Sequence, residues 1–144
     1  MGSVAGMDAG TGDDSDTVAK EPGATEPGET EIATETGTIA LERQDDRVVV
    51  RVTGALDLAL APRLQQFVDR AARLHPALLV LDLTEVDFLA SAGMAVLVKA
   101  NRNQVAPTQM RVVAADRVVL RPLQMTRLTD ELAVYPTLAE AFAG

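Results

Sequence analysis

Ser91 has the clearest potential for chemistry in this sequence, because Gly93 follows it as in the second half of a Gly-x-Ser-x-Gly nucleophile elbow. The first half is missing, since Leu89 stands where the first glycine should be. The one imidazole, that of His75, lies at the end of a predicted helix, and the sequence has no cysteine. A serine hydrolase, a thiolate nucleophile and a His- or Cys-based metal site are therefore not expected. No glycine-rich phosphate loop occurs either, so we predict neither an enzyme nor a bound cofactor.

Ser91 directly precedes an apolar helical run, and this position allows two interpretations. Its hydroxyl can cap the helix by accepting a hydrogen bond from a first-turn N–H, a contact worth about 1 kcal/mol. It can also accept a phosphate, which would meet the positive end of the helix. That phosphate would add about two negative charges to a surface that already carries Asp57 and Asp87. A partner shaped for a neutral hydroxyl would then be repelled, while the domain stayed folded.

Asp57 likewise has two interpretations. Its carboxylate can close an Asx turn after Gly54, or it can contact a partner. The glycines Gly54 and Gly93 are better explained by backbone geometry or close packing than by chemistry. Met94 is expected mainly in the core, with part of its side chain at an interface.

The elements that must position these residues follow from hydrophobic periodicity. Short β-branched or apolar runs predict strands at 38–41, 48–52, 78–83, 110–113 and 132–134. Helical spacing and capping signals predict four helices, which begin near Ala61, after Ser91, at Arg117 and after Thr137. Leu64, Phe67, Val68 and Ala71 form the apolar stripe of the first helix. Strands alternating with helices predict a mixed α/β domain.

The charge of the chain is confined to its first part. The net charge is -8, and residues 1–36 carry nine acidic side chains against one lysine, so the remainder is neutral. Few apolar side chains occur there, which predicts a disordered, solubilising acidic tail over 1–36 before a domain over 38–144. The neutral domain has no basic excess for nucleic acid. No apolar run is long enough to cross a bilayer, and the lack of cysteine fits the cytoplasm, where we expect the protein.

The order of the predicted elements and three motifs resemble the STAS domain of the bacterial anti-sigma factor antagonists over essentially all of 38–144. The motifs are 52–57 (Val-Thr-Gly-Ala-Leu-Asp), 86–94 (Val-Asp-Phe-Leu-Ala-Ser-Ala-Gly-Met) and 119–128. This resemblance implies a single STAS-like domain with a mixed sheet of four to five strands and about four helices. It also implies that the protein binds an anti-sigma factor, often a serine kinase, and so releases a sigma factor to RNA polymerase.

The resemblance also implies roles for particular residues. Ser91 falls on the position that accepts phosphate, which switches an antagonist off, and Asp57 falls in the turn that shares the partner-binding surface. The family usually has an aspartate before this serine, where the present sequence has Ala90. Alanine also replaces the family's residues at Ala55, Ala92 and Ala95. The partner-binding residues predicted in this way are Leu56, Asp57, Asp87, Ala90, Ser91, Ala92, Gly93 and Met94.

A second role remains open within the same family. A STAS domain can be a fixed structural or regulatory subunit of a transporter or of a stress-signalling scaffold, without phosphorylation. For the isolated chain we expect a monomer or a weak dimer.

Overall fold

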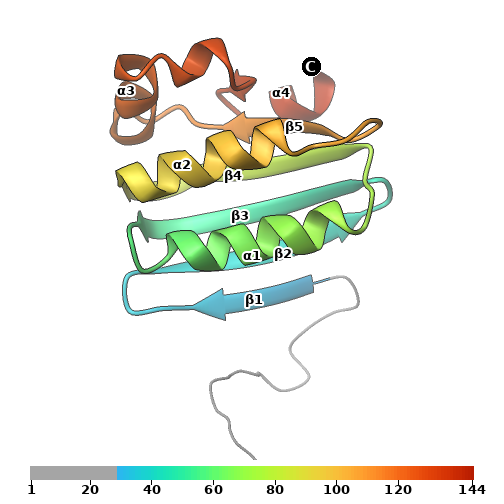
Figure 1. The fold of residues 1–144 in the computed structure, drawn as a ribbon, viewed down its shortest axis with the longest axis horizontal. Coiled ribbons are helices and arrows are strands. Elements are labelled where there is room, and N and C mark those ends of the chain that lie inside the picture. Colours follow the sequence, from blue (N-terminus) through green and yellow to red (C-terminus); the bar gives the residue numbers. More distant parts are fainter. Residues whose placement is uncertain (1–28) are drawn as a thin grey trace, which may run out of the picture.

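The computed structural model describes residues 29–144, which form one mixed sheet with helices on both faces (Figure 1). The sheet has six strands in the order β1-β2-β3-β4-β5-β6. The strands are β1 (Glu29–Ala33), β2 (Gly37–Gln44), β3 (Arg47–Leu56), β4 (Leu78–Leu89), β5 (Gln109–Val113) and β6 (Val134–Tyr135). The helices are α1 (Ala61–Ala72), α2 (Ser91–Arg102), α3 (Arg117–Met125), the 3-10 turn η2 (Leu128–Asp130) and α4 (Leu138–Ala143).

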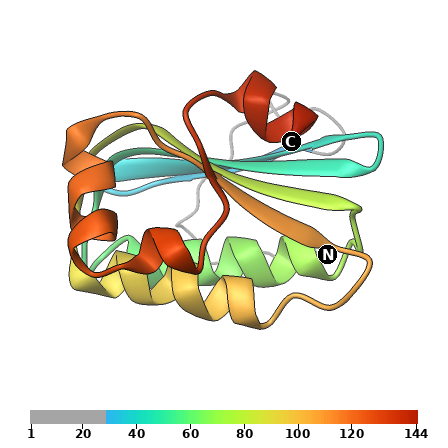
Figure 2. The same cartoon turned by 90° about the horizontal axis from the view of Figure 1, so that it is seen from above.

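The type of strand pairing changes once across the sheet, from antiparallel to parallel at β3. The first three strands pair antiparallel, whereas β3, β4, β5 and β6 are parallel neighbours. α1 connects β3 to β4 and α2 connects β4 to β5, whereas α3 and η2 lie between β5 and β6 in the chain. α1 and α2 lie side by side on one face of the sheet, with α4 on the other (Figure 2). The carboxyl ends of β3 and β4 therefore meet at one edge of the sheet, and the loops that follow them start together.

The main core lies between the sheet and the pair α1 and α2. Along β3 the residues Val48, Val50 and Val52 belong to it, which is the alternation expected for a strand with two different faces. The predicted apolar stripe of α1 is confirmed, since Leu64, Phe67, Val68 and Ala71 are all buried. Leu97 of α2 is also fully buried, so both helices are held against the same sheet face.

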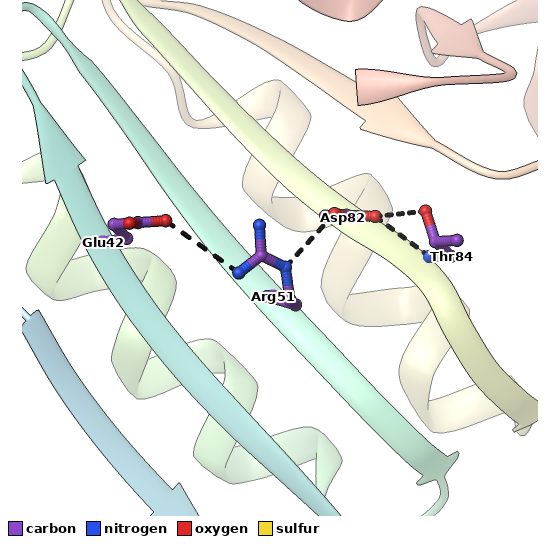
Figure 3. A network of polar contacts seen from close by, with 4 residues as sticks. All are labelled: Glu42, Arg51, Asp82 and Thr84. Carbon is purple, nitrogen blue, oxygen red and sulfur yellow. Dashed lines mark hydrogen bonds and ion pairs between the residues drawn. The ribbon is translucent and has the colours of Figure 1, made fainter. Parts of the chain in front are cut away.

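The opposite face has a smaller core under α4, formed with Val49, Val80 and Val113. The predicted cap of this helix is confirmed, because the Glu140 N–H donates to Thr137 Oγ1 at 3.1 Å. Beside α4, the rest of this face carries a polar network that joins β2, β3 and β4 (Figure 3).

The network is centred on Asp82, the one buried charged residue in the part of the chain that the structure describes. Its Oδ2 lies 3.4 Å from Arg51 Nε, and its Oδ1 accepts hydrogen bonds from the backbone N–H and hydroxyl of Thr84. Arg51 also reaches Glu42, at 3.9 Å. Because a buried carboxylate without partners would be costly, these contacts explain how an aspartate is tolerated inside the central strand.

The structure corrects the sequence prediction at the start of the domain. The tail predicted as disordered up to residue 36 is wrong for its last part, because Glu29–Ala33 form β1, and the sheet has six strands instead of four to five. Ile32 pairs with Ile39 and packs against the core, while Glu31 is exposed. One partly buried side chain in an acidic segment is too weak a pattern to reveal a strand. The prediction for residues 1–28 lies outside the described residues.

Strand boundaries also differ from the prediction, and the strands predicted at 38–41 and 48–52 are longer, as Gly37–Gln44 and Arg47–Leu56. The strand predicted at 78–83 continues to Leu89, because its end pairs with β3 through two register shifts. The last strand is Val134–Tyr135, displaced toward the C-terminus from the predicted 132–134, since Leu132 is buried in the core before the strand begins.

Two N-terminal deletions distinguish the contribution of β1 to stability from that of the residues before it. We expect removal of residues 1–36 to lower the free energy of unfolding by about 1–3 kcal/mol, because Ile32 and its cover of the core are lost. Removal of residues 1–28, whose composition is that of a solubilising tail, should leave it unchanged. Urea unfolding of both forms beside the full chain measures the difference, and equal midpoints for all three would show that β1 contributes nothing.

Candidate docking surface

The loops that carry Asp57 and Ser91 start side by side. The last residues of β3 and β4, Leu56 and Leu89, are register partners, and the Ala90 N–H donates to the Leu56 carbonyl oxygen at 3.0 Å. Asp57 directly follows one strand, and Ser91 comes two residues after the end of the other. The structure thus brings together the two segments that the sequence singled out.

Asp57 forms the Asx turn that was one of its two interpretations. Its Oδ1 accepts hydrogen bonds from the N–H groups of Ala59 at 3.1 Å and Leu60 at 3.0 Å, just before α1 begins. The hydrogen bond from Leu60 is the main cause that lowers the pKa of Asp57 from its ordinary value of 3.8. The carboxylate is therefore ionised at neutral pH and keeps a negative charge beside Ser91.

The lowered pKa predicts how the Asp57 turn responds to acid. A carboxyl group whose pKa is lower in the folded state stabilises the fold above its unfolded pKa, and this stability is lost as pH falls through the folded pKa. We expect Asp57→Asn to unfold more easily than wild type at pH 6, with a difference that shrinks below pH 3.8 and then vanishes. Denaturant titrations at several pH values measure this, with Asp87→Asn as a control for charge loss alone. A difference that stays constant down to pH 2.5 would contradict it.

The N-cap interpretation of Ser91 is wrong. The cap position is Ala90, whose backbone is extended (φ -86°, ψ 164°) and whose carbonyl oxygen accepts the Met94 N–H at 3.1 Å. Ser91 is consequently the first residue of α2, one position too late for its side chain to cap the helix. Its side chain is exposed, and the hydroxyl has no hydrogen-bond partner within residues 29–144. An alcohol group therefore stands free at the positive end of the helix.

Two of the predicted partner contacts lie inside the core. Leu56 is fully buried, and Gly93 faces it so closely that a Cβ on Gly93 would lie 2.7 Å from Leu56 Cγ. As side-chain contacts for a partner, these two predictions are wrong, because the strand alternation turns Leu56 inward and the helix turns Gly93 toward it. The close packing of α2 on Leu56 explains why a glycine is needed two residues after the serine.

The other predicted contacts lie nearer the solvent. Asp87 is exposed, and Ala90, Ala92 and Met94 are half-buried. Sequence reasoning missed two apolar side chains at this edge, namely Leu58 with 77% and Phe88 with 53% of its surface exposed. Asp57, Leu58, Asp87, Phe88 and Ser91 all lie within two residues of the paired strand ends Leu56 and Leu89, and we call them the Ser91 surface. Exposed apolar groups next to charged ones are typical of a protein-binding surface, and an apolar residue inside a turn was the signal for Leu58.

An open groove runs along α2 from Ser91 and has a volume of about 590 Å³. One wall is a stripe of α2, and the other is the segment between α3 and η2. We call it the α2 groove. Its lining residues are Ser91, Met94, Ala95, Val98, Lys99, Arg102, Asn103, Thr126 and Leu128.

Two further findings concern other kinds of site. Within residues 29–144, no three His, Cys, Asp or Glu side chains are grouped so that they could hold a metal ion. No helix in that range has the length and apolar composition needed to span a membrane.

Comparisons with known proteins agree with this architecture. The profile of the STAS domain family matches residues 38–141. The anti-sigma-F factor antagonist RsfB of Mycobacterium tuberculosis is 27% identical over 107 residues, which cover 74% of this chain and 88% of that protein. An anti-sigma factor antagonist from Mycobacterium paratuberculosis is 33% identical, with a TM-score of 0.72 over 77% of this chain and 95% of that one.

A more distant structure shares the fold. The anti-sigma factor antagonist SpoIIAA in its unphosphorylated form has 19% identity and a TM-score of 0.61, over 72% of this chain and 92% of that one. The family profile covers most of this chain, and a relative of 33% identity is matched over 95% of its own length. The predicted resemblance is therefore confirmed. The chain belongs to the STAS domain family and within it is similar to bacterial anti-sigma factor antagonists.

Proposed function

We propose that this chain is a cytoplasmic anti-sigma factor antagonist, which binds an anti-sigma factor through the Ser91 surface and thereby frees a sigma factor. The observation that carries the proposal is the free Ser91 hydroxyl at the start of α2, bordered at the same sheet edge by exposed apolar and acidic side chains. The similarity to RsfB and to the Mycobacterium paratuberculosis antagonist supports the class of partner. Binding, not catalysis, is the proposed activity.

We further propose that the partner is a serine kinase and that Ser91 is its phosphate acceptor. The Ser91 hydroxyl oxygen would attack the γ-phosphorus of ATP held by the partner, with ADP leaving and the hydroxyl proton passing to a base of the kinase. The exposure of Ser91 and the lack of a hydrogen bond to its hydroxyl within residues 29–144 support this role. Ala90 removes a carboxylate beside the acceptor, so any kinase must recognise the serine through other groups of the surface.

Phosphate at Ser91 would act on binding more than on folding. The free N–H groups of the first turn of α2 favour a negative group, which keeps the helix intact. The same group would add about two charges to a surface that already holds the ionised Asp57 and the exposed Asp87.

The proposal is tested by direct binding. Each anti-sigma factor encoded in the same genome is purified and titrated into the full chain, with and without ATP, and phosphate transfer is followed by intact-mass spectrometry. We expect one of them to bind and to add a single phosphate, which Ser91→Ala prevents. If none binds, the chain is not an antagonist of these factors. If one binds but leaves the mass unchanged in ATP, docking stands and phosphorylation of Ser91 does not.

A further inference from the structure

We propose that the α2 groove receives one amphipathic helix of the anti-sigma factor, which carries an acidic side chain opposite Lys99. This inference rests on the proposed function and specifies which element of the partner is bound. The groove is separate from the loop that holds Asp57, but the two surfaces meet at Ser91, which lines one end of the groove.

The dimensions of the groove fit a helix. Ser91, Ala95, Val98 and Arg102 recur at spacings of three and four residues, so they form one continuous stripe along α2. The eleven steps from Ser91 to Arg102 span about 16 Å, which is the length of three helical turns. A helix bound beside α2 would therefore place residues i, i+3 or i+4, and i+7 along the full groove.

The lining of the groove selects an apolar helix face. Met94 and Val98 from α2 meet Leu128 from the opposite wall, and all three are half-buried in the free chain, so apolar surface remains to be covered. Met125, which precedes the wall residue Thr126 in the sequence, is a further exposed apolar side chain, with 71% of its surface accessible. Apolar side chains exposed on both sides of a groove are typical of a helix-binding site.

The charges of the groove select the acidic side chain. Arg102 is already neutralised, because Glu131 accepts from its Nε at 2.7 Å and from its Nη2 at 3.1 Å. Lys99 lines the same end and has no ion-pair partner among the residues that the structure describes. The free positive charge of the groove is therefore at Lys99, and an aspartate or glutamate of the bound helix would complement it.

The position of Ser91 at the groove end links this site to the proposed switch. A phosphate on Ser91 would lie at the end of the groove away from Lys99 and would add bulk and about two negative charges there. A helix whose apolar face packs against the neutral Ser91 would lose that contact, because a charged group would be buried against apolar side chains. Phosphorylation of Ser91 would therefore weaken the binding of the partner helix in the groove directly.

Three groove variants test the inference in the full chain against the purified anti-sigma factors of the same genome. Ala95→Trp fills the groove from an exposed position, Val98→Asp places a charge in its apolar part, and Lys99→Glu reverses its free charge. We expect about 100-fold weaker binding for the first two and about 10-fold weaker binding for the third. Circular dichroism verifies folding. The matched controls are Val105→Asp and Arg63→Glu, which are exposed outside the groove and should bind like wild type.

The outcomes separate the two proposals. If wild type binds and Ser91→Glu does not, while all three groove variants bind like wild type, the groove inference is overturned and the proposed function stands. If wild type binds none of the anti-sigma factors, both fail. The remaining alternative is that a second copy of this chain fills the groove, and sedimentation of wild type and Ala95→Trp tests it. A wild-type dimer that this substitution dissociates would establish that alternative and overturn the inference. A partner with Asp or Glu replaced by Lys that restores binding to Lys99→Glu would establish the predicted charge pair.

Discussion

Gly54→Ala is expected to lose about 2–4 kcal/mol of folding free energy, because two costs act at the same residue. The backbone of Gly54 has a φ of +84°, which side chains with a Cβ rarely adopt. In addition, a Cβ at this position would lie 2.3 Å from the carbonyl oxygen of Thr36, and backbone cannot move aside as easily as a side chain can. The turn that presents Asp57 begins three residues later, so the variant should also weaken binding at the Ser91 surface.

Urea unfolding of Gly54→Ala measures the loss of folding free energy. Asp45→Gly is the control, because it makes the reverse change, from a side chain to glycine, at another positive φ. Asp45 has a positive φ of 54° in the turn between β2 and β3, so glycine should be tolerated there within about 1 kcal/mol. A Gly54→Ala protein as stable as wild type would show that the strand end relaxes without cost and that the glycine is not required.

The second large effect is expected at Ser91, where Ser91→Glu should bind the anti-sigma factor about 10–100-fold more weakly than Ser91→Gln. The two substitutions have nearly the same size, so their difference isolates the charge. Glutamate would lie at the same sheet edge as Asp57 and Asp87, and like charges at an interface oppose a partner that fits a neutral group. Both variants should fold, since an acidic group in the first turn of a helix is favourable by about 0.3–1 kcal/mol.

Isothermal titration of each Ser91 variant with the bound anti-sigma factor gives the affinities, and thermal unfolding gives the stabilities. Equal affinities for the glutamate and glutamine variants would exclude an electrostatic switch. A lower unfolding temperature for glutamate alone would place the effect in the fold instead of the interface.

Much of the fold could be predicted because its signals are local. The alternation of Val48, Val50 and Val52 and the stripe from Leu64 to Ala71 identify a strand and a helix from their own periods. β1 could not be recognised, because Ile32 reaches the core only through its pairing with Ile39 of the next strand, and no local pattern reveals this pairing. The end of β4 was missed for a similar reason, because its pairing with β3 involves two register shifts that no sequence period reveals.

The candidate site was predicted in its position and only partly in its detail. The Asx turn of Asp57 follows from a local hydrogen-bonding preference. The helix start differs from the prediction by one residue, and this difference leaves the Ser91 hydroxyl free. The inward orientation of Leu56 depends on strand register, which the sequence does not specify at this edge. The α2 groove joins Val98 to Leu128, thirty positions apart, and its apolar side chains are indistinguishable from core residues in sequence.

Displacement of a sigma factor tests the central claim most directly. A labelled sigma factor is bound to its anti-sigma factor from the same genome, the full chain is added, and release is followed by fluorescence anisotropy. We predict that wild type and Ser91→Ala release the sigma factor in a concentration-dependent manner, whereas Ser91→Glu at the same concentrations releases little. Failure of the wild-type chain to displace any sigma factor from any anti-sigma factor of that genome would contradict the proposed function.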